Sequence, residues 1–187
     1  MKKVLVLLAP GFEEVEALSI VDFLRRVEIP VETASTTEDL LIKGSHGINV
    51  QADVIFDDVK SLYDAVMIPG GIPGAPNLRD NEKVIEYIKK MHDAKKYIAA
   101  ICAGPIVLEK AGVIKDKKVT SYPGFEAELK SAKYINDNVV VDENIITSRG
   151  PATAILLAVK LAEILKDKAS SDKLKNGLLL PLLLNEK

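Results

Sequence analysis

The sequence contains a single cysteine and no tryptophan among its 187 residues. One cysteine excludes a disulfide within the chain and any zinc site built from several cysteines. Aromatic residues make up 5% of the chain, which is too few for the stacking platforms that bind single-stranded nucleic acids. The net charge is −2, so charge gives no reason to expect binding to nucleic acid or to an anionic membrane.

Long apolar runs are also absent. The N-terminal run that starts at Val4 is short and is soon followed by Glu13 and Glu14, so it fits a first strand better than a signal peptide. No run approaches the roughly 18 apolar residues that a membrane-spanning helix needs. We therefore expect a cytoplasmic protein with no membrane segment.

Short apolar runs alternate with longer amphipathic segments along the chain. The continuous apolar runs predict strands that are buried on both faces, at residues 4–8, 31–34, 65–68 and 97–101. Apolar residues at helical spacing predict helices over residues 13–27, 82–93, 104–111, 153–165 and 170–176. This order predicts one α/β domain over residues 1–187, with a mostly parallel sheet and helices on both faces.

Several shorter features complete this pattern. Two hairpins are predicted, one from strands at 40–43 and 48–53 and one from strands at 138–141 and 144–147. A further strand is predicted at 118–121, and glycines and prolines predict a loop over 70–76. In parallel sheets, ligands bind beyond the carboxyl ends of the strands. Three segments are expected to meet there, at residues 10–16, 69–74 and 102–104.

Cys102 stands where a buried strand ends and a helix begins. The small residues Ala103 and Gly104 permit a sharp turn, as in the nucleophile elbow of hydrolases. The N-terminus of the following helix would favour a thiolate and lower the thiol pKa by about one unit or less. The alternative is a small, inert core residue, which is a common fate of a lone cysteine. We predict a reactive thiol.

Glu16 is the second candidate. It lies beside the apolar stripe of the first helix, and facing inward over the strand ends it would have a raised pKa and could donate a hydrogen bond to sulfur. The alternative is a solvated first turn, which accounts well for Glu13 and Glu14.

The histidines offer no simple catalytic partner for Cys102, since His92 is predicted at the surface and His46 in a turn. The sequence therefore predicts neither a metal site nor a cofactor.

Four motifs follow one another along the chain. They are APGFEEVE at 9–16, IPGG at 68–71, AAICAGP at 99–105 and TSRGP at 147–151. In this order and spacing the chain resembles the DJ/ThiJ/PfpI superfamily over essentially its whole length, and is most similar to the branch of the parkinsonism-associated protein deglycase. The resemblance implies a flavodoxin-like three-layer sandwich of the class I glutamine amidotransferase type, a homodimer and no cofactor.

The resemblance also implies roles for individual residues. Cys102 would be the nucleophile, and Glu16 the carboxyl that hydrogen-bonds it and stabilises its sulfinate form. The backbone of Gly70, Gly71 and Ala103 would form an oxyanion-type pocket beside the thiol. The supporting residues implied are Arg26 on the dimer-side surface, Arg149 in the Ser-Arg-Gly-Pro loop near the site, Tyr122 and His46.

Three positions depart from patterns in the superfamily. Tyr122 stands near the cysteine where many members of this branch have a histidine, and its reference pKa of about 10 makes it a poor proton shuttle at neutral pH. His46 stands where close relatives carry an arginine that reaches across the dimer, so we expect His46 at the rim of the partner's site. Ala103 follows the cysteine where protease-type members have histidine, which argues against a peptidase.

The resemblance leaves two functions open. In the first, Cys102 attacks a small aldehyde such as methylglyoxal, Glu16 moves protons and a hydroxy acid is released, with deglycation of early glyoxal adducts on proteins as a related activity. In the second, the protein senses oxidative stress or protects other proteins in a chaperone-like way, and Cys102 oxidises to the sulfinic acid because no second cysteine can resolve it. A thiamine-pathway role has no support in these residues, and a structural dimer with an inert thiol is the remaining alternative.

Overall fold

The computed structural model describes residues 2–184. Its main sheet contains β1 (Val4–Leu8), β2 (Val31–Ser35), β5 (Val54–Ile55), β6 (Ala65–Ile68), β7 (Tyr97–Ile101), β10 (Val139–Asp142) and β11 (Ile145–Ser148). Among the described residues the strand order is β10-β11-β7-β6-β1-β2-β5, and all neighbours are parallel except β10 and β11. The run β2-β1-β6-β7-β11 has the flavodoxin-like order, which confirms the predicted fold class.

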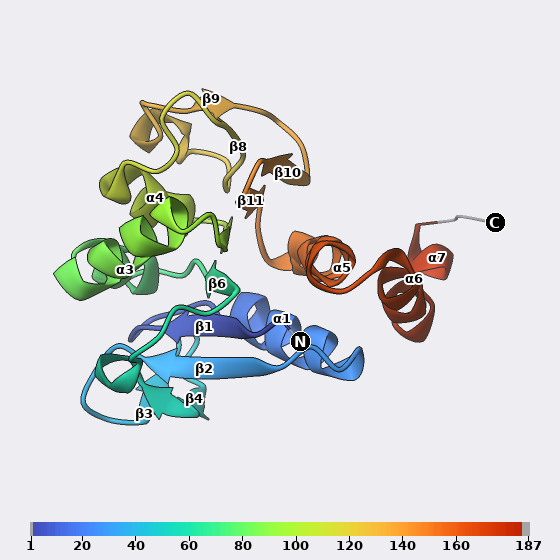
Figure 1. Cartoon of the computed structure of the whole chain (residues 1–187), viewed down its shortest axis with the longest axis horizontal. Coiled ribbons are helices and arrows are strands. Elements are labelled where there is room, and N and C mark those ends of the chain that lie inside the picture. Colours follow the sequence, from blue (N-terminus) through green and yellow to red (C-terminus); the bar gives the residue numbers. More distant parts are fainter. Residues whose placement is uncertain (1, 185–187) are drawn as a thin grey trace.

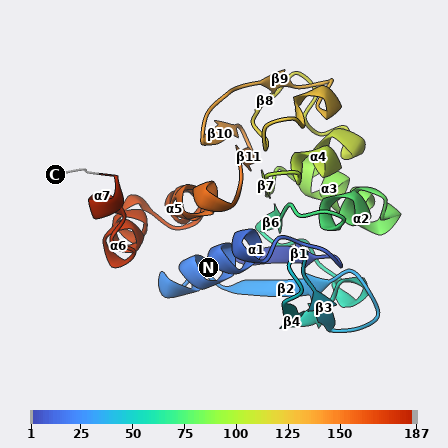
Figure 2. The same cartoon turned by 180° about the vertical axis from the view of Figure 1, so that it is seen from behind.

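Helices cover both faces of this sheet (Figures 1 and 2). On one side lie α1 (Glu14–Arg26), α5 (Ala154–Leu165) and α6 (Lys168–Gly177), and on the other α2 (Gly74–Arg79), α3 (Glu82–Asp93) and α4 (Pro105–Ala111). Strand β1 shows why two layers are needed, because its side chains alternate between the faces. Val4 and Val6 pack in the core with α1 and α5, whereas Leu5 and Leu7 pack with α3 and α4.

Some elements differ from those predicted. The first predicted hairpin is confirmed as β3 (Leu41–Lys43) and β4 (Asn49–Gln51), and the second as β10 and β11. The segment predicted as a loop over 70–76 enters α2 at Gly74, because Pro76 in the first turn costs no helical hydrogen bond. The strand predicted at 118–121 is shorter, since β8 (Lys118–Val119) pairs only with the two-residue strand β9 (Lys133–Tyr134). The last short helix, α7 (Leu180–Leu183), was not predicted.

Helix α5 is long and strongly apolar, with 12 residues. At 1.5 Å per residue it is about 18 Å long, well short of a bilayer core of about 30 Å. None of the helices found within residues 2–184 combines the length and the apolar character needed to cross a membrane. The cytoplasmic location stays a prediction.

Candidate active site

The three predicted segments meet at the carboxyl ends of β1, β6 and β7, which are neighbours in the sheet. Gly70, after β6, lies at the centre of this meeting point. A Cβ placed on Gly70 would lie 2.7 Å from Cβ of Cys102, 2.8 Å from Oε2 of Glu16 and 3.0 Å from the backbone nitrogen of Ala103. The structure therefore brings Gly70, Cys102 and Glu16 together, and their roles stay predictions.

Cys102 adopts a left-handed backbone conformation, with φ of 62°. Such a conformation costs a non-glycine residue roughly 1–3 kcal/mol, and it persists only where the surroundings hold it. Here the Cys102 N–H donates to the carbonyl of Ser148 at 3.0 Å, and the Cys102 carbonyl accepts from the Tyr122 N–H at 3.0 Å. The sharp turn after β7 is thus present, and backbone hydrogen bonds to two other segments hold it in place.

The Cys102 thiol is half-buried. Burial, followed by the charge and hydrogen bond of Glu16, raises the pKa of the thiol to about 12, against the opposing effect of the Ala103 and Gly71 backbone N–H groups. The predicted direction, a lowered pKa from the helix N-terminus, is therefore wrong for the resting pair. The reason is that α4 has only seven residues, and its dipole cannot offset desolvation together with a neighbouring carboxylate.

Glu16 is fully buried, with 0% of its surface exposed. The Gly70 N–H donates to its Oε2 at 2.8 Å, while Oε1 is buried and has no hydrogen-bond partner within residues 2–184. Burial, only partly opposed by the Gly70 N–H, raises the pKa of Glu16 to about 7. Glu16 therefore faces inward, and the alternative of a solvated first turn is wrong for Glu16 and also for Glu14, which is 3% exposed because the hairpin covers it. Two acids in one dry site cannot both be charged cheaply, so Glu16 and the thiol act as a coupled pair.

Tyr122 and Arg149 also lie close to the turn. Besides the backbone bond to Cys102, the Tyr122 ring packs over Gly150, where an added Cβ would lie 3.1 Å from a ring carbon. A small surface pocket next to the turn is lined by Tyr122, Pro123, Asn138, Arg149, Gly150, Pro151, Ala152 and Thr153. Sequence reasoning missed Asn138 in this wall, and it missed that the Ser148 carbonyl holds Cys102. The contact between Ser148 and Cys102 could have been indicated only by the position of Ser148 in the Ser-Arg-Gly-Pro motif.

The fold does not bring Arg26 to the thiol. Arg26 lies ten residues after Glu16 in α1, which is about 15 Å along the helix axis, and its Nε donates to Asp22 at 2.7 Å. His46 contacts Glu14 of its own chain, with Nδ1 3.1 Å from Oε2. Its expected place at the partner's rim stays a prediction.

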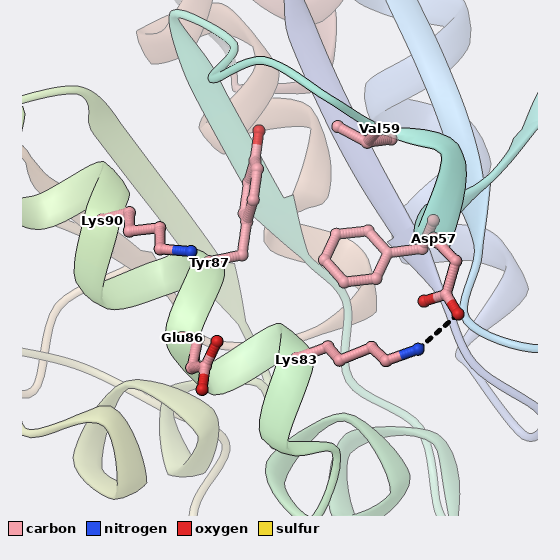
Figure 3. A pocket seen from close by; sticks show the side chains of 7 residues that line it. Asp57, Val59, Lys83, Glu86, Tyr87 and Lys90 are labelled. Carbon is pink, nitrogen blue, oxygen red and sulfur yellow. Dashed lines mark hydrogen bonds and ion pairs between the residues drawn. The ribbon is translucent and has the colours of Figure 1, made fainter.

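A second pocket lies between α3 and the turn at Phe56–Asp58, and no predicted site residue lines it. Figure 3 shows the Lys83 side chain of α3 paired with Asp57, and Tyr87 on the same helix. Tyr87 packs edge-on against Phe56, with ring centres 5.4 Å apart. This pocket is lined by surface ion-pair and core-edge residues, so the cluster around Cys102 remains the candidate active site.

Comparisons with known proteins agree with this assignment. The model of the DJ-1/PfpI family matches residues 2–164. Protein dj-1beta of Drosophila melanogaster is 39% identical over 181 residues, 95% of this chain and 97% of that protein. Its crystal structure matches with a TM-score of 0.93 at 38% identity, over 95% of this chain and 97% of that one.

This chain covers very different shares of the length of two further relatives. The glutathione-independent glyoxalase DJ-1 of Schizosaccharomyces pombe is 32% identical over 192 residues, which cover 97% of this chain and 100% of that protein. Protein DJ-1 homolog B of Arabidopsis thaliana is 37% identical over 163 residues, 86% of this chain. This chain spans only 37% of the length of the Arabidopsis protein. The predicted resemblance is confirmed.

Replacing Glu16 by glutamine is expected to flatten the pH dependence of stability. The Glu16 pKa is raised from 4.5 to about 7 in the folded protein, so its stabilising contribution is complete below pH 4.5 and is lost as pH rises through 7. The loss amounts to roughly 3 kcal/mol. Urea unfolding in chelator-treated buffer should show wild-type stability falling across this range more steeply than that of Glu16→Gln. Equal slopes would show that Glu16 ionises normally.

Replacing Gly70 by alanine should disrupt the site. The new methyl group would press on Cys102, Glu16 and Ala103 at once, and overpacking of this kind costs typically about 1–3 kcal/mol. Gly177→Ala is the matched control, because no atom lies within 4 Å of a Cβ placed there. Gly70→Ala should lower the melting temperature and change the rate of thiol alkylation. Gly177→Ala should leave alkylation unchanged and should not lower the melting temperature, because alanine is favoured over glycine in a helix. Equal behaviour of the two variants would contradict the crowding at Gly70.

Proposed function

Because the chain belongs to the DJ-1/PfpI family, we propose that it is a cofactor-free enzyme of the glyoxalase or deglycase type that acts on small reactive aldehydes. The observation that carries this proposal is the left-handed turn at Cys102, which sets the thiol between two backbone N–H groups and the buried Glu16 carboxyl. The name of the Schizosaccharomyces pombe relative, a glutathione-independent glyoxalase, supports chemistry of this class.

The proposed reaction begins when Cys102 sulfur bonds to the aldehyde carbon of methylglyoxal. Glu16 takes the thiol proton and passes it to the new alkoxide, giving a hemithioacetal, and the N–H groups of Gly71 and Ala103 stabilise the negative oxygen. Glu16 next moves the proton from the former aldehyde carbon to the ketone carbon, while the hydroxyl proton on the former aldehyde carbon passes to the ketone oxygen. The former aldehyde carbon is thereby oxidised to a thioester and the ketone carbon is reduced to an alcohol. Water then breaks the resulting thioester and releases lactate and the free thiol.

Glu16 is suited to both proton transfers. A general acid and base works best with a pKa near the operating pH, and burial brings the Glu16 pKa to about 7. Tyr122 is not needed for this step, since its side chain is 47% exposed and its ring packs on Gly150. The replacement of the family histidine by tyrosine is therefore compatible with turnover.

The second candidate is a redox-responsive protein whose Cys102 is oxidised to the sulfinic acid. It is favoured by the buried, unpartnered Oε1 of Glu16, which as a protonated carboxyl could donate to an oxygen on sulfur. In either reaction Glu16 could remove the thiol proton as the sulfur attacks, so the raised pKa of the resting thiol does not separate the two functions. The aldehyde function ranks first because a relative that is 32% identical over its whole length is named a glyoxalase.

Within this proposal the protein acts as a homodimer. Val15 in the first turn of α1 and Ile48 in the hairpin turn are 53% and 54% exposed. The two segments touch, because the Ile48 N–H donates to Oε1 of Glu14 at 3.3 Å. Neighbouring exposed apolar side chains are typical of an interaction surface, and this pair is the proposed centre of the dimer contact.

Replacing Val15 by glutamate should convert the dimer to a monomer, because a charge buried without a partner costs several kcal/mol. Sedimentation equilibrium would measure the change in mass. Val141→Glu is the matched control, since Val141 is 43% exposed on β10, and it should leave the dimer intact. A monomeric wild-type protein, or a dimeric Val15→Glu variant, would refute this interface.

Aldehyde turnover should depend on both site residues. Reduced wild-type protein should convert methylglyoxal to lactate, Cys102→Ser should not, and Glu16→Gln should be slower by roughly 10²–10⁴-fold. Glu28→Gln is the control for the amide substitution, because the Glu28 side chain is 76% exposed. No turnover by reduced wild-type protein would transfer support to the redox function, which mass spectrometry of peroxide-treated Cys102 would then test.

A further inference from the structure

A cluster of metal-ligating side chains lies beside the candidate active site. Glu13 and Glu14, at the start of α1, meet His46 from the turn between β3 and β4, with one ligand atom of each within 4.8 Å of the others. His46 is 32 positions from Glu14, so no ligand spacing is visible in the sequence. The contact arises because the hairpin folds over the first turn of the helix, where the Ser45 N–H donates to the Phe12 carbonyl at 2.9 Å.

The separations of the ligand atoms fit a small tetrahedral cation. His46 Nδ1 lies 3.1 Å from Oε2 of Glu14 and 3.4 Å from Oε2 of Glu13. Zinc bonds of about 2.0–2.1 Å to nitrogen and oxygen place ligand atoms about 3.3–3.4 Å apart in a tetrahedron. Two of the three separations therefore suit one ion, and the third lies within 4.8 Å. A fourth ligand would come from solvent or, in the proposed dimer, from the partner.

The two carboxylates are short of positive charge. The Glu14 side chain is 3% exposed and that of Glu13 is 13% exposed. Within residues 2–184, His46 is the only basic side chain at ion-pair distance from either of them. Backbone N–H groups of His46 and Ile48 donate to Oε1 of Glu14, so the shortage of positive charge concerns the Oε2 atoms. Buried charges in proteins are normally hydrogen-bonded and paired with a cation, or bound to a metal.

Counting hydrogens indicates the same shortage. Oε2 of Glu13, Oε2 of Glu14, Ser45 Oγ and His46 Nδ1 make five contacts of 3.0–3.4 Å with one another. Only the serine hydroxyl and one imidazole N–H can supply hydrogens to these contacts. The two hydrogens must therefore be shared among the five contacts, and a cation bound between the two carboxylates and the imidazole would relieve that shortage.

We propose that Glu13, Glu14 and His46 form a binding site for a divalent transition-metal cation of the zinc class, separate from the thiol. Imidazole with carboxylates suits zinc and its neighbours rather than magnesium or calcium, which prefer oxygen ligands alone. The ion would tie the hairpin to the start of α1. It would also steady the active-site loop, because the Glu13 N–H donates to the Gly70 carbonyl at 3.0 Å.

Isothermal titration of the chelator-treated full-length protein with zinc chloride tests this site. The expected result is one ion per chain, with affinity at least tenfold weaker in His46→Ala and in Glu13→Gln. Zinc should also raise the wild-type melting temperature, because a ligand that binds only the folded state stabilises it, and it should raise that of His46→Ala much less. Both substituted residues lie at the edge of the fold, so the variants should remain folded.

Two controls separate this site from other places where zinc could bind. His92→Ala, at the other histidine, and Cys102→Ser, at the thiol, should both bind zinc as the wild type does. Binding that is lost in Cys102→Ser but kept in His46→Ala would place the ion on the sulfur and overturn the proposal. Absence of zinc binding by the wild-type protein, or a full site in His46→Ala, would also overturn it. None of these results depends on aldehyde turnover.

Discussion

The absence of a side chain at Gly70 lets the rest of the site form. Strand β6 lies between β1 and β7, so the residue that follows it is caught between the first helix and the cysteine turn. Any Cβ there would overlap groups from both neighbours. Because the approach is so close, the Gly70 N–H can bind Glu16, whose carboxyl is fully buried beside the half-buried thiol. The coupled ionisation of the pair follows from this burial and from their closeness.

The parts of the fold that could be predicted are those whose signal is local and repeated. Strands β1, β6 and β7 are continuous apolar runs because both faces are covered. Helix α3 combines a regular apolar stripe with Asn81, whose side chain caps the first turn. The two-residue strands β8 and β9 carry no such repeat, and they exist only because distant segments pair. Helix α2 was hidden by its glycine and proline, which are more common in loops.

The candidate site likewise combines features that the sequence could predict with features that it could not. Cys102 and Glu16 could be identified because small residues mark the turn and because Glu16 adjoins an apolar stripe. The direction of the thiol pKa could not be predicted, since a helix N-terminus is a local feature whereas desolvation depends on what packs around the sulfur. The meeting of His46 with Glu13 and Glu14 was equally invisible, because it depends on where a hairpin settles.

The first turn of α1 joins these two regions. Successive residues of a helix are turned by about 100°, so Glu14 and Glu16 point about 200° apart, one toward the hairpin and the other over the strand ends. Glu13 belongs to the outer cluster, yet its charge also raises the pKa of Glu16. Positive charge gathered at the outer cluster therefore opposes that repulsion and favours the ionised form of Glu16. Burial sets the pKa of the Glu16 carboxyl first, and the charge of the neighbouring cluster, outside the thiol site, contributes the smaller part.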